Sequence, residues 1–274
     1  MSEALTPDRS SAMRRERALK ILIPILMLVA LVGFWQWYVT AFNVPHYILP
    51  SPVRVAGAMI TDWNILGPAL LVTLKITFAA LGLALGGGLL LAILLVQSRW
   101  IEIALSPYLV ILQVTPIVAI APLILIYAPT TQTALLICAF IVAFFPVLSN
   151  TVQGLKSTDH NLLDLYKLYG AGRAQTLFLL RLPAALPYFL AGLKIAGGLS
   201  LIAAVVAEFA AGSAGAGSGL AFRILESQFR LNIPRLFAAL ILLSVAGVAI
   251  YAATSVISWL LLHKWHESAI RREQ

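Results

Sequence analysis

The chain has 274 residues, of which 61% are hydrophobic and only 11% are charged. Soluble domains contain roughly 45–50% apolar and about 25% charged residues, so this composition excludes an ordinary soluble domain and indicates an integral membrane protein. The net charge of +8 does not require a nucleic-acid ligand, because basic residues are also enriched in the cytoplasmic loops of membrane proteins.

The first two spans are predicted from uncharged stretches, since a membrane-spanning helix needs about 20 mostly apolar residues. Residues 21–41 contain no charge and end with Trp35, Trp37 and Tyr38, which are typical of an interfacial aromatic belt. Residues 76–98 are also uncharged and form the second predicted span, which we expect to begin near Pro68.

The third and fourth spans are predicted from residues 103–155, which contain no charged residue over 53 positions. A single helix of that length would run about 80 Å at 1.5 Å per residue. A bilayer core is about 30 Å thick, so we expect two spans. The predicted break is at residues 128–133, because Pro129 disfavours helix at the preceding residue. Pro116 and Pro122 are expected to kink the first of these spans, and Pro146 the second.

The last two spans are predicted at residues 188–209 and 236–262, which gives an all-α integral membrane protein with six transmembrane helices. With the N-terminus inside, fourteen basic residues fall on inside segments and five on outside segments. The positive-inside rule therefore predicts that both termini are cytoplasmic. We expect one transmembrane domain at residues 21–262 between short tails at residues 1–20 and 263–274, with a cytoplasmic loop at residues 156–187.

This loop reads as two short helices joined by a glycine turn. The first is predicted at residues 161–169, with Asp159 or Asn161 as N-cap and with Gly170 at the position that needs φ > 0. A second helix is expected at residues 173–180, and Leu182-Pro183 is expected to end it. One apolar stripe is formed at i, i+3, i+4 and i+7 by Leu162, Leu165, Tyr166 and Tyr169. From the residues alone, such a stripe fits either a helix lying on the membrane surface or a docking element for a cytoplasmic partner.

The loop also resembles a family motif. The pattern Asp164-x5-Gly170-x9-Leu180-x-Leu182-Pro183 is similar to the EAA loop of binding-protein-dependent ABC transporter permeases, which reads E-A-A-x3-G-x9-I-x-L-P. Asp164 stands in place of the glutamate, and Leu165 and Tyr166 stand in place of the alanines. The stretches "LPSPVRV" (49–55), "TPIVAIAPLILIY" (115–127) and "VVAEF" (205–209) resemble the nitrate/sulfonate/taurine branch of that family.

The resemblance implies a type I ABC importer permease-like fold and a non-catalytic membrane subunit in the bacterial inner membrane. It implies a homodimer, or a pair with a close paralogue, that works with two cytoplasmic ATPase subunits and a periplasmic or lipid-anchored binding protein. Cofactors are expected on the partners, as ATP and Mg, and none on this chain. The solute would be nitrate/sulfonate/taurine-type or a pyrimidine or vitamin precursor. The residues implied in ATPase coupling are Leu162, Asp164, Leu165, Tyr166, Tyr169, Gly170, Ala171, Leu182 and Pro183.

Polar residues near the spans give further candidates. Glu208 is the one acidic residue within a predicted span, and it would either line the pathway or gate, or only reach the lipid headgroups. Gln113 and Thr115 would line the pathway or bond to neighbouring helices. Arg230 and Arg235 would face outward and contact the binding protein. The glycine-rich stretch at 212–219 could share that contact or be only a flexible connection, and it lacks the Gly-Lys-Ser/Thr of a phosphate-binding loop.

Other classes of function find little support in the residues. No catalytic constellation is evident, and the His263/His266 pair has no third ligand, so we expect no metal site. The single cysteine, Cys138, is expected to be a small buried hydrophobe. A stand-alone ion-coupled carrier is the alternative function, but charged or broken helices near the midplane, which are typical of that class, are not clearly present.

Overall fold

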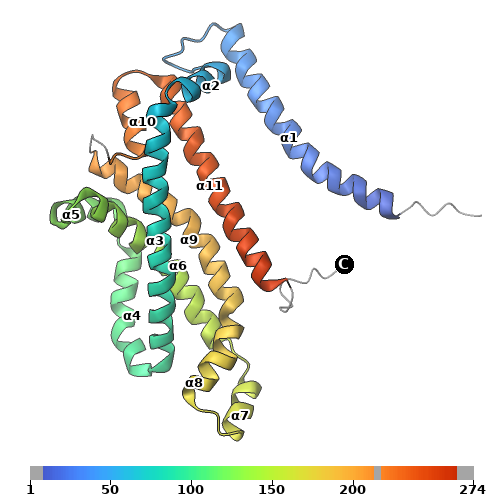
Figure 1. The fold of residues 1–274 in the computed structure, drawn as a ribbon, viewed down its shortest axis with the longest axis vertical. Helices are drawn as coiled ribbons and strands as arrows, with labels where there is room; N and C mark the ends of the chain where they lie inside the picture. Colours follow the sequence, from blue (N-terminus) through green and yellow to red (C-terminus); the bar gives the residue numbers. More distant parts are fainter. Residues whose placement is uncertain (1–8, 213–216, 264–274) are drawn as a thin grey trace, which may run out of the picture. The chain divides into compact units, whose positions relative to one another are not determined.

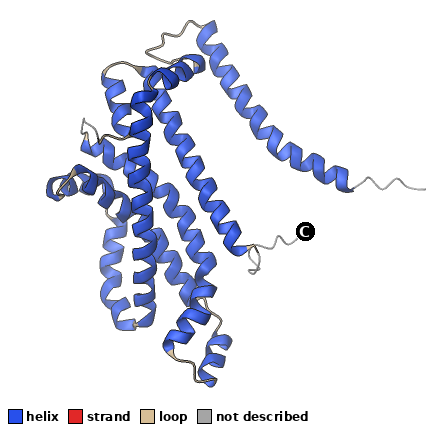
Figure 2. Cartoon of the chain, in the orientation of Figure 1, coloured by secondary structure: helices blue, strands red, loops and turns tan. Residues whose placement is uncertain are grey.

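The computed structural model describes residues 9–212 and 217–263, and within these ranges it contains helices and loops but no strand (Figure 2). The predicted all-α fold is confirmed. The tail residues 1–8 and 264–274, which include His266, and residues 213–216 of the predicted glycine-rich loop lie outside the described residues. The chain forms two compact units, residues 1–63 with 227–238 and residues 64–226 with 239–274, and each is described by itself.

The smaller unit contains the first apolar span. The helices that lie wholly within it are α1 (Arg9–Ala41) and α2 (Pro52–Thr61) (Figure 1). The Ser51 hydroxyl caps α2 by accepting from the Arg54 N–H, and Pro52 occupies the first helical turn, where its missing N–H costs nothing. At the end of the first span, the centroid of the Trp35 ring lies 5.8 Å from that of the Phe237 ring.

The larger unit contains most of the apolar helices. The remaining helices of the chain are α3 (Trp63–Gln97), α4 (Arg99–Val114), α5 (Ile117–Tyr127), α6 (Thr131–Lys156), α7 (His160–Leu168), α8 (Arg173–Thr176), the single π-helical turn η1 (Leu177–Arg181), α9 (Leu182–Ala211), α10 (Leu220–Phe229) and α11 (Ile233–Leu262). The second span begins before Pro68, which lies inside α3.

Five of the described helices are long and apolar enough to span a membrane, and a sixth span is reached if α4 and α5 together form one broken span. The break lies at Thr115-Pro116, where the chain bends by 101° between α4 and α5. Pro116 was expected to kink a continuous helix, and the structure instead has two short helices there. The predicted break at residues 128–133 is confirmed, since α5 ends at Tyr127 and α6 begins at Thr131. Pro146 lies inside α6 without interrupting it.

The core of the larger unit is the crossing of α6 and α9. Small side chains let the two backbones approach closely, as is common between membrane helices. A Cβ added at Gly192 would lie 2.9 Å from the Pro146 carbonyl oxygen, and one at Gly154 would lie 2.7 Å from the Tyr188 Cβ. Cys138 is buried in the same core as a free thiol, as predicted.

The glycines of α3 differ sharply in their surroundings. Gly82 and Gly86 have the four-residue spacing that is typical of close helix packing, but open space lies where a Cβ would be added to either of them. A Cβ at Gly88 would instead lie 2.8 Å from Val147 of α6. Within this chain, the tight approach of α3 to α6 therefore occurs at Gly88, two residues after Gly86.

Gly192→Val is expected to destabilise the purified chain by about 1–3 kcal/mol, because overpacking a close helix crossing forces the backbones apart. Gly82→Val is the matched control, since it makes the same change inside a helix where nothing lies within 4 Å. Denaturant or thermal unfolding of both variants in detergent measures the difference. Equal stability of the two variants would contradict the close approach.

Candidate functional site

The loop between α6 and α9 has the helix–glycine–helix form that the sequence predicts. The Asp159 side chain caps α7 by accepting from the Asn161 N–H at 2.9 Å. Gly170 has φ +70°, in the left-handed region, and the Ala171 N–H donates back to the Tyr166 carbonyl at 2.9 Å. This hydrogen bond closes the end of α7 and is available because glycine adopts the left-handed conformation without steric cost.

The end of the loop differs from the prediction. Leu182-Pro183 was expected to end the second short helix, but α8, η1 and α9 follow one another without a break. In the π turn the Leu182 N–H donates to the Leu177 carbonyl, five residues back. The wider turn changes the hydrogen-bond register just before Pro183, so its missing N–H does not end the helix. Leu182 and Pro183 therefore lie in the first turn of α9.

The apolar stripe of α7 is exposed in the chain. Leu162, Leu165 and Tyr169 are exposed, with Tyr169 at 83%, while Tyr166 is half-buried. The helix α3 ends at Gln97 and α4 begins at Arg99. Figure 1 shows α7 and α8 lying beyond these adjoining ends of α3 and α4. Large apolar side chains gathered on one face of a helix outside the spans indicate an interaction surface.

Asp164 lies on α7 beside this stripe, and its side chain is exposed. Its carboxylate accepts from Lys167 Nζ at 2.8 Å, one helical turn further along. This hydrogen bond and the charge of Lys167 lower the pKa of Asp164 below its ordinary value. Asp164 is therefore an exposed anion on the surface of α7.

Gln113 and Thr115 line one cavity at the bend between α4 and α5. The cavity has a volume of about 400 Å³ and is also lined by residues of α6 and α9, among them Ser149, Asn150 and Phe145. The Thr115 hydroxyl donates at 2.6 Å to the Ile111 carbonyl, which also accepts from the Thr115 backbone N–H at 3.1 Å. A space of this size with a few polar groups on apolar walls is typical of a small-molecule site.

Glu208 does not line that cavity. Its side chain is 3% exposed, and its two carboxyl oxygens accept from the Thr73 hydroxyl at 2.7 Å and from the Ala221 N–H at 3.0 Å. The Thr73 oxygen in turn accepts from the Leu220 N–H at 2.9 Å. The two side chains thus cap the first two N–H groups of α10 from α9 and α3, where negative charge is also favoured by the helix dipole.

This buried cap was only partly visible in the sequence. Glu208 was identified by its charge, whereas Thr73 and Gly219 were missed. Gly219 precedes α10, and a methyl group there would overlap with the Glu208 carboxyl group. A threonine in an uncharged span and a glycine before a short helix are weak signals, because both occur commonly for other reasons.

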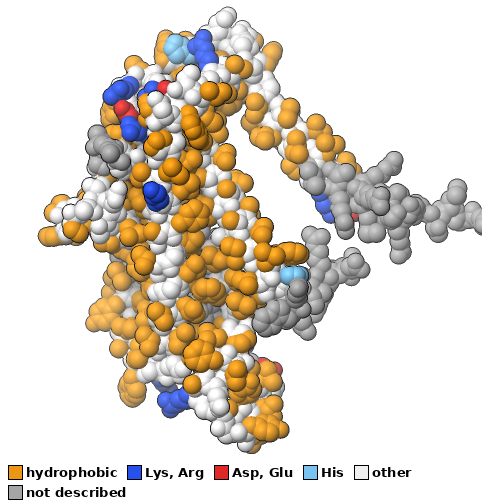
Figure 3. All heavy atoms as spheres, viewed as in Figure 1, with side chains coloured by type: hydrophobic (Ala, Val, Ile, Leu, Met, Phe, Trp, Pro, Cys, Tyr) orange, Lys and Arg blue, Asp and Glu red, His pale blue; other side chains and the backbone are white. Residues whose placement is uncertain are grey.

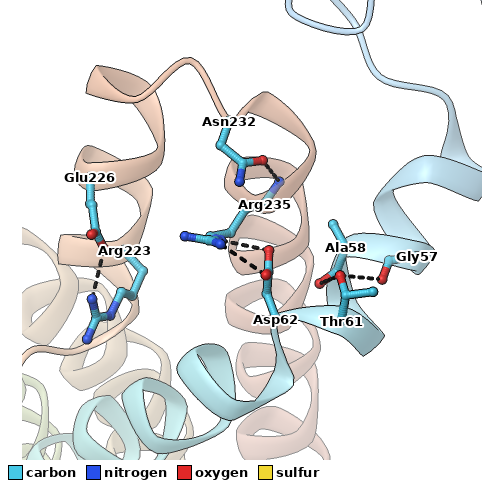
Figure 4. A network of polar contacts seen from close by, with 8 residues as sticks. All are labelled: Gly57, Ala58, Thr61, Asp62, Arg223, Glu226, Asn232 and Arg235. Carbon is cyan, nitrogen blue, oxygen red and sulfur yellow. Dashed lines mark hydrogen bonds and ion pairs between the residues drawn. The ribbon is translucent and has the colours of Figure 1, made fainter.

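The candidate contacts for a binding protein lie near the start of α11. Arg235 forms a bidentate ion pair with Asp62, with Nε–Oδ2 at 2.7 Å and Nη2–Oδ1 at 2.9 Å (Figure 4). The Asn232 side chain accepts from the backbone N–H of Arg235 and caps the helix. Arg230 is exposed. In the larger unit, Arg223 and Glu226 of α10 form a second pair at 2.8 Å (Figure 4).

The surface is otherwise mostly apolar. Figure 3 shows hydrophobic side chains over most of the visible flanks of the helices, with Lys and Arg in a few small groups. Within residues 9–212 and 217–263, no group of three or more His, Cys, Asp or Glu side chains is placed to hold a metal ion.

Comparison with known proteins gives matches over most of the chain. Residues 84–272 match the family described as binding-protein-dependent transport system inner membrane component. The chain is 36% identical over 245 residues to a probable ABC transporter permease protein of Haemophilus influenzae, which covers 89% of this chain and 96% of that protein. It is 35% identical over 253 residues to the riboflavin transport system permease protein of Chloroflexus aurantiacus, covering 90% of each.

Relatives with other named solutes match less closely. A putative aliphatic sulfonates transport permease protein of Bacillus subtilis is 29% identical, covering 89% of this chain and 87% of that protein. A nitrate import permease protein of Synechocystis is 27% identical, covering 84% and 85%. The crystal structure of an amino acid ABC transporter with histidines has a similar fold, with a TM-score of 0.61 at 20% identity, covering 74% of this chain and 95% of that chain.

Proposed function

Because the chain belongs to the family of binding-protein-dependent transport system inner membrane components and is an ABC transporter permease, we propose that it forms the translocation pathway of an importer. The family expected from the EAA-like loop is thereby confirmed, and its relatives include sulfonate and nitrate permeases. A small polar solute would reach this pathway from an extracytoplasmic binding protein.

The observation that supports coupling to an ATPase is the exposed apolar stripe of α7. Leu165 and Tyr169 project from a short helix that is capped at one end by Asp159 and closed at the other by Gly170. A helix held in this way presents its aromatic and aliphatic anchors in a fixed orientation, which suits docking into a groove of a partner. In this proposal ATP and Mg bind to two partner ATPase subunits, and α7 transmits their movement to the spans.

The cavity beside Gln113 and Thr115 supports a pathway for a polar solute. A volume of about 400 Å³ admits a small molecule, and the side chains of Ser149 and Asn150 add hydrogen-bonding groups. Named solutes differ among the relatives, from riboflavin to nitrate. We therefore propose only the class, a nitrate-, sulfonate- or taurine-type anion or a pyrimidine or vitamin precursor. Two copies of the chain, or one with a close paralogue, would form the complete pathway in the bacterial inner membrane.

Leu165→Asp is expected to abolish copurification of the partner ATPase subunits, because it places a charge at the centre of the apolar stripe. Asn161→Asp is the matched control, since it adds the same charge to the exposed surface of α7 at a polar residue outside the stripe. Copurification of coexpressed subunits in detergent measures the effect. If Leu165→Asp retains the ATPase as well as Asn161→Asp does, α7 is not the docking helix.

A stand-alone ion-coupled carrier remains the alternative function. It is tested by reconstituting the purified chain alone into liposomes and measuring solute uptake with and without an ion gradient. An importer permease shows no uptake in this experiment. Gradient-driven uptake without an ATPase would exclude the importer.

A further inference from the structure

A cavity of about 510 Å³ lies on the side of α7 that faces away from the apolar stripe. Its walls come from the end of α3, from α7, and from the continuous α8–η1 segment. On α7 the lining residues are His160, Leu163 and Lys167, which share one face at i, i+3 and i+7. A ligand in this cavity would therefore leave the stripe residues accessible.

The charged side chains that line the cavity are all basic. Lys167 lines it from α7, and Arg173 and Arg181 line it from α8 and η1, where their spacing of eight residues places them on one face. Lys167 is paired with Asp164. Among the described residues neither arginine has an ion-pair partner, and the buried Nε of Arg181 has no hydrogen-bond acceptor. The buried Nε–H of Arg181 thus lacks the acceptor that such a group normally has, and the exposed Arg173 beside it adds a second guanidinium group to a cavity that no carboxylate lines.

The position of the cavity indicates where the missing acceptors would come from. Gln97, which lines it, is the last residue of the span α3, and η1 leads directly into the span α9. The cavity therefore lies at the ends of apolar helices, and for helices that span a bilayer this is where lipid phosphates are expected. Basic pockets between the ends of transmembrane helices are suited to phospholipid headgroups, and guanidinium groups match the oxygens of a phosphate in a bidentate manner.

We propose that this cavity binds the phosphodiester headgroup of an anionic phospholipid through Arg173 and Arg181, with Lys167 adding positive charge. The bound headgroup would connect α3, α7 and η1 and so hold the loop against the membrane. This proposal does not depend on the solute or on the ATPase. The lipid site can therefore be refuted while the importer function holds, and the importer function can be refuted while the lipid site holds.

The test uses the purified full chain in detergent, titrated with dioctanoyl phosphatidylglycerol and monitored by native mass spectrometry or thermophoresis. Arg173→Gln and Arg181→Gln are each expected to weaken the affinity about fivefold, which corresponds to the loss of one basic residue near a lipid surface. Arg99→Gln is the matched control, since it removes one exposed positive charge at the neighbouring end of α4, outside the cavity. We expect its affinity to stay within about twofold of the wild type.

Several outcomes would overturn the proposal. An equal loss in Arg99→Gln would show attraction by net charge rather than by the cavity. Equal binding of dioctanoyl phosphatidylcholine would show that the negative charge is not recognised. Displacement of the lipid by inorganic phosphate, with the same dependence on Arg173, would identify the cavity as a site for a soluble anion. Arg173 is exposed, so its substitution tests the cavity even if Arg181→Gln lowers the stability of the fold.

Discussion

Gly170→Val is expected to abolish solute-stimulated ATP hydrolysis by the assembled importer, while the purified chain remains folded. Gly170 has φ +70°, and a β-branched residue in this region is a strong steric outlier. The left-handed conformation costs an ordinary L-residue about 1–2 kcal/mol. Valine would favour another backbone conformation and break the hydrogen bond from Ala171 to Tyr166, so α7 would lose its fixed orientation relative to α8. The measurement is ATPase stimulation and solute uptake in proteoliposomes that contain all subunits.

The control for this prediction is the neighbouring glycine. Gly172 has φ −68° and ψ 163°, an extended conformation that valine adopts readily. A Cβ at that position would meet only the Gln175 side chain, at 3.8 Å. Gly172→Val should therefore retain most of the stimulation. Wild-type stimulation in Gly170→Val would show that the turn does not transmit the movement of the ATPase.

Thr73→Val is expected to destabilise the chain by about 2–3 kcal/mol, because it leaves two buried hydrogen-bonding groups without partners. The Thr73 hydroxyl donates to Glu208 and accepts from the Leu220 N–H, so its loss affects both. Thr77→Val is a closely matched control one turn further along α3. Thr77 is equally buried, but its hydroxyl bonds only to the Thr73 carbonyl of its own helix. We expect Thr77→Val to lower the free energy of unfolding by less than about 1 kcal/mol.

Glu208→Gln separates the capping role from a gating role. The amide keeps one acceptor oxygen, so a cap predicts a loss of stability smaller than that of Thr73→Val. A double-mutant cycle of Glu208→Gln with Thr73→Val should then be strongly non-additive, because the two residues share one hydrogen bond. Thermal unfolding in detergent measures each term. Additive losses, together with altered uptake in Glu208→Gln, would favour the gate over the cap.

The sequence predicted the elements that depend on local patterns. The turn at Gly170 and the N-cap at Asp159 follow from short-range preferences that neighbouring elements do not alter. The apolar spans follow from length and composition. The orientation of the termini, which was predicted from the basic residues, stays a prediction.

The features that the sequence did not predict depend on contacts between distant segments. Pro116 and Pro146 look alike in the sequence, yet the chain bends by 101° at the first and continues as a helix through the second. Gly82 and Gly88 differ only in which neighbour they face. The role of Thr73 depends on residues 135 and 147 positions away, so no local pattern could have indicated it.

Because η1 continues directly into α9, a movement at the loop can be carried along the helix to its other end. Arg181 and Glu208 are 27 positions apart along it, which corresponds to about 40 Å at 1.5 Å per residue. A rigid rod of that length that tilts by about 5° at one end moves the other end by about 3.5 Å. This displacement exceeds the 2.7 Å length of the bond between Thr73 and Glu208. A small rotation imposed at the loop and carried along the helix would thus be enough to break the hydrogen bond between Thr73 and Glu208 at its opposite end.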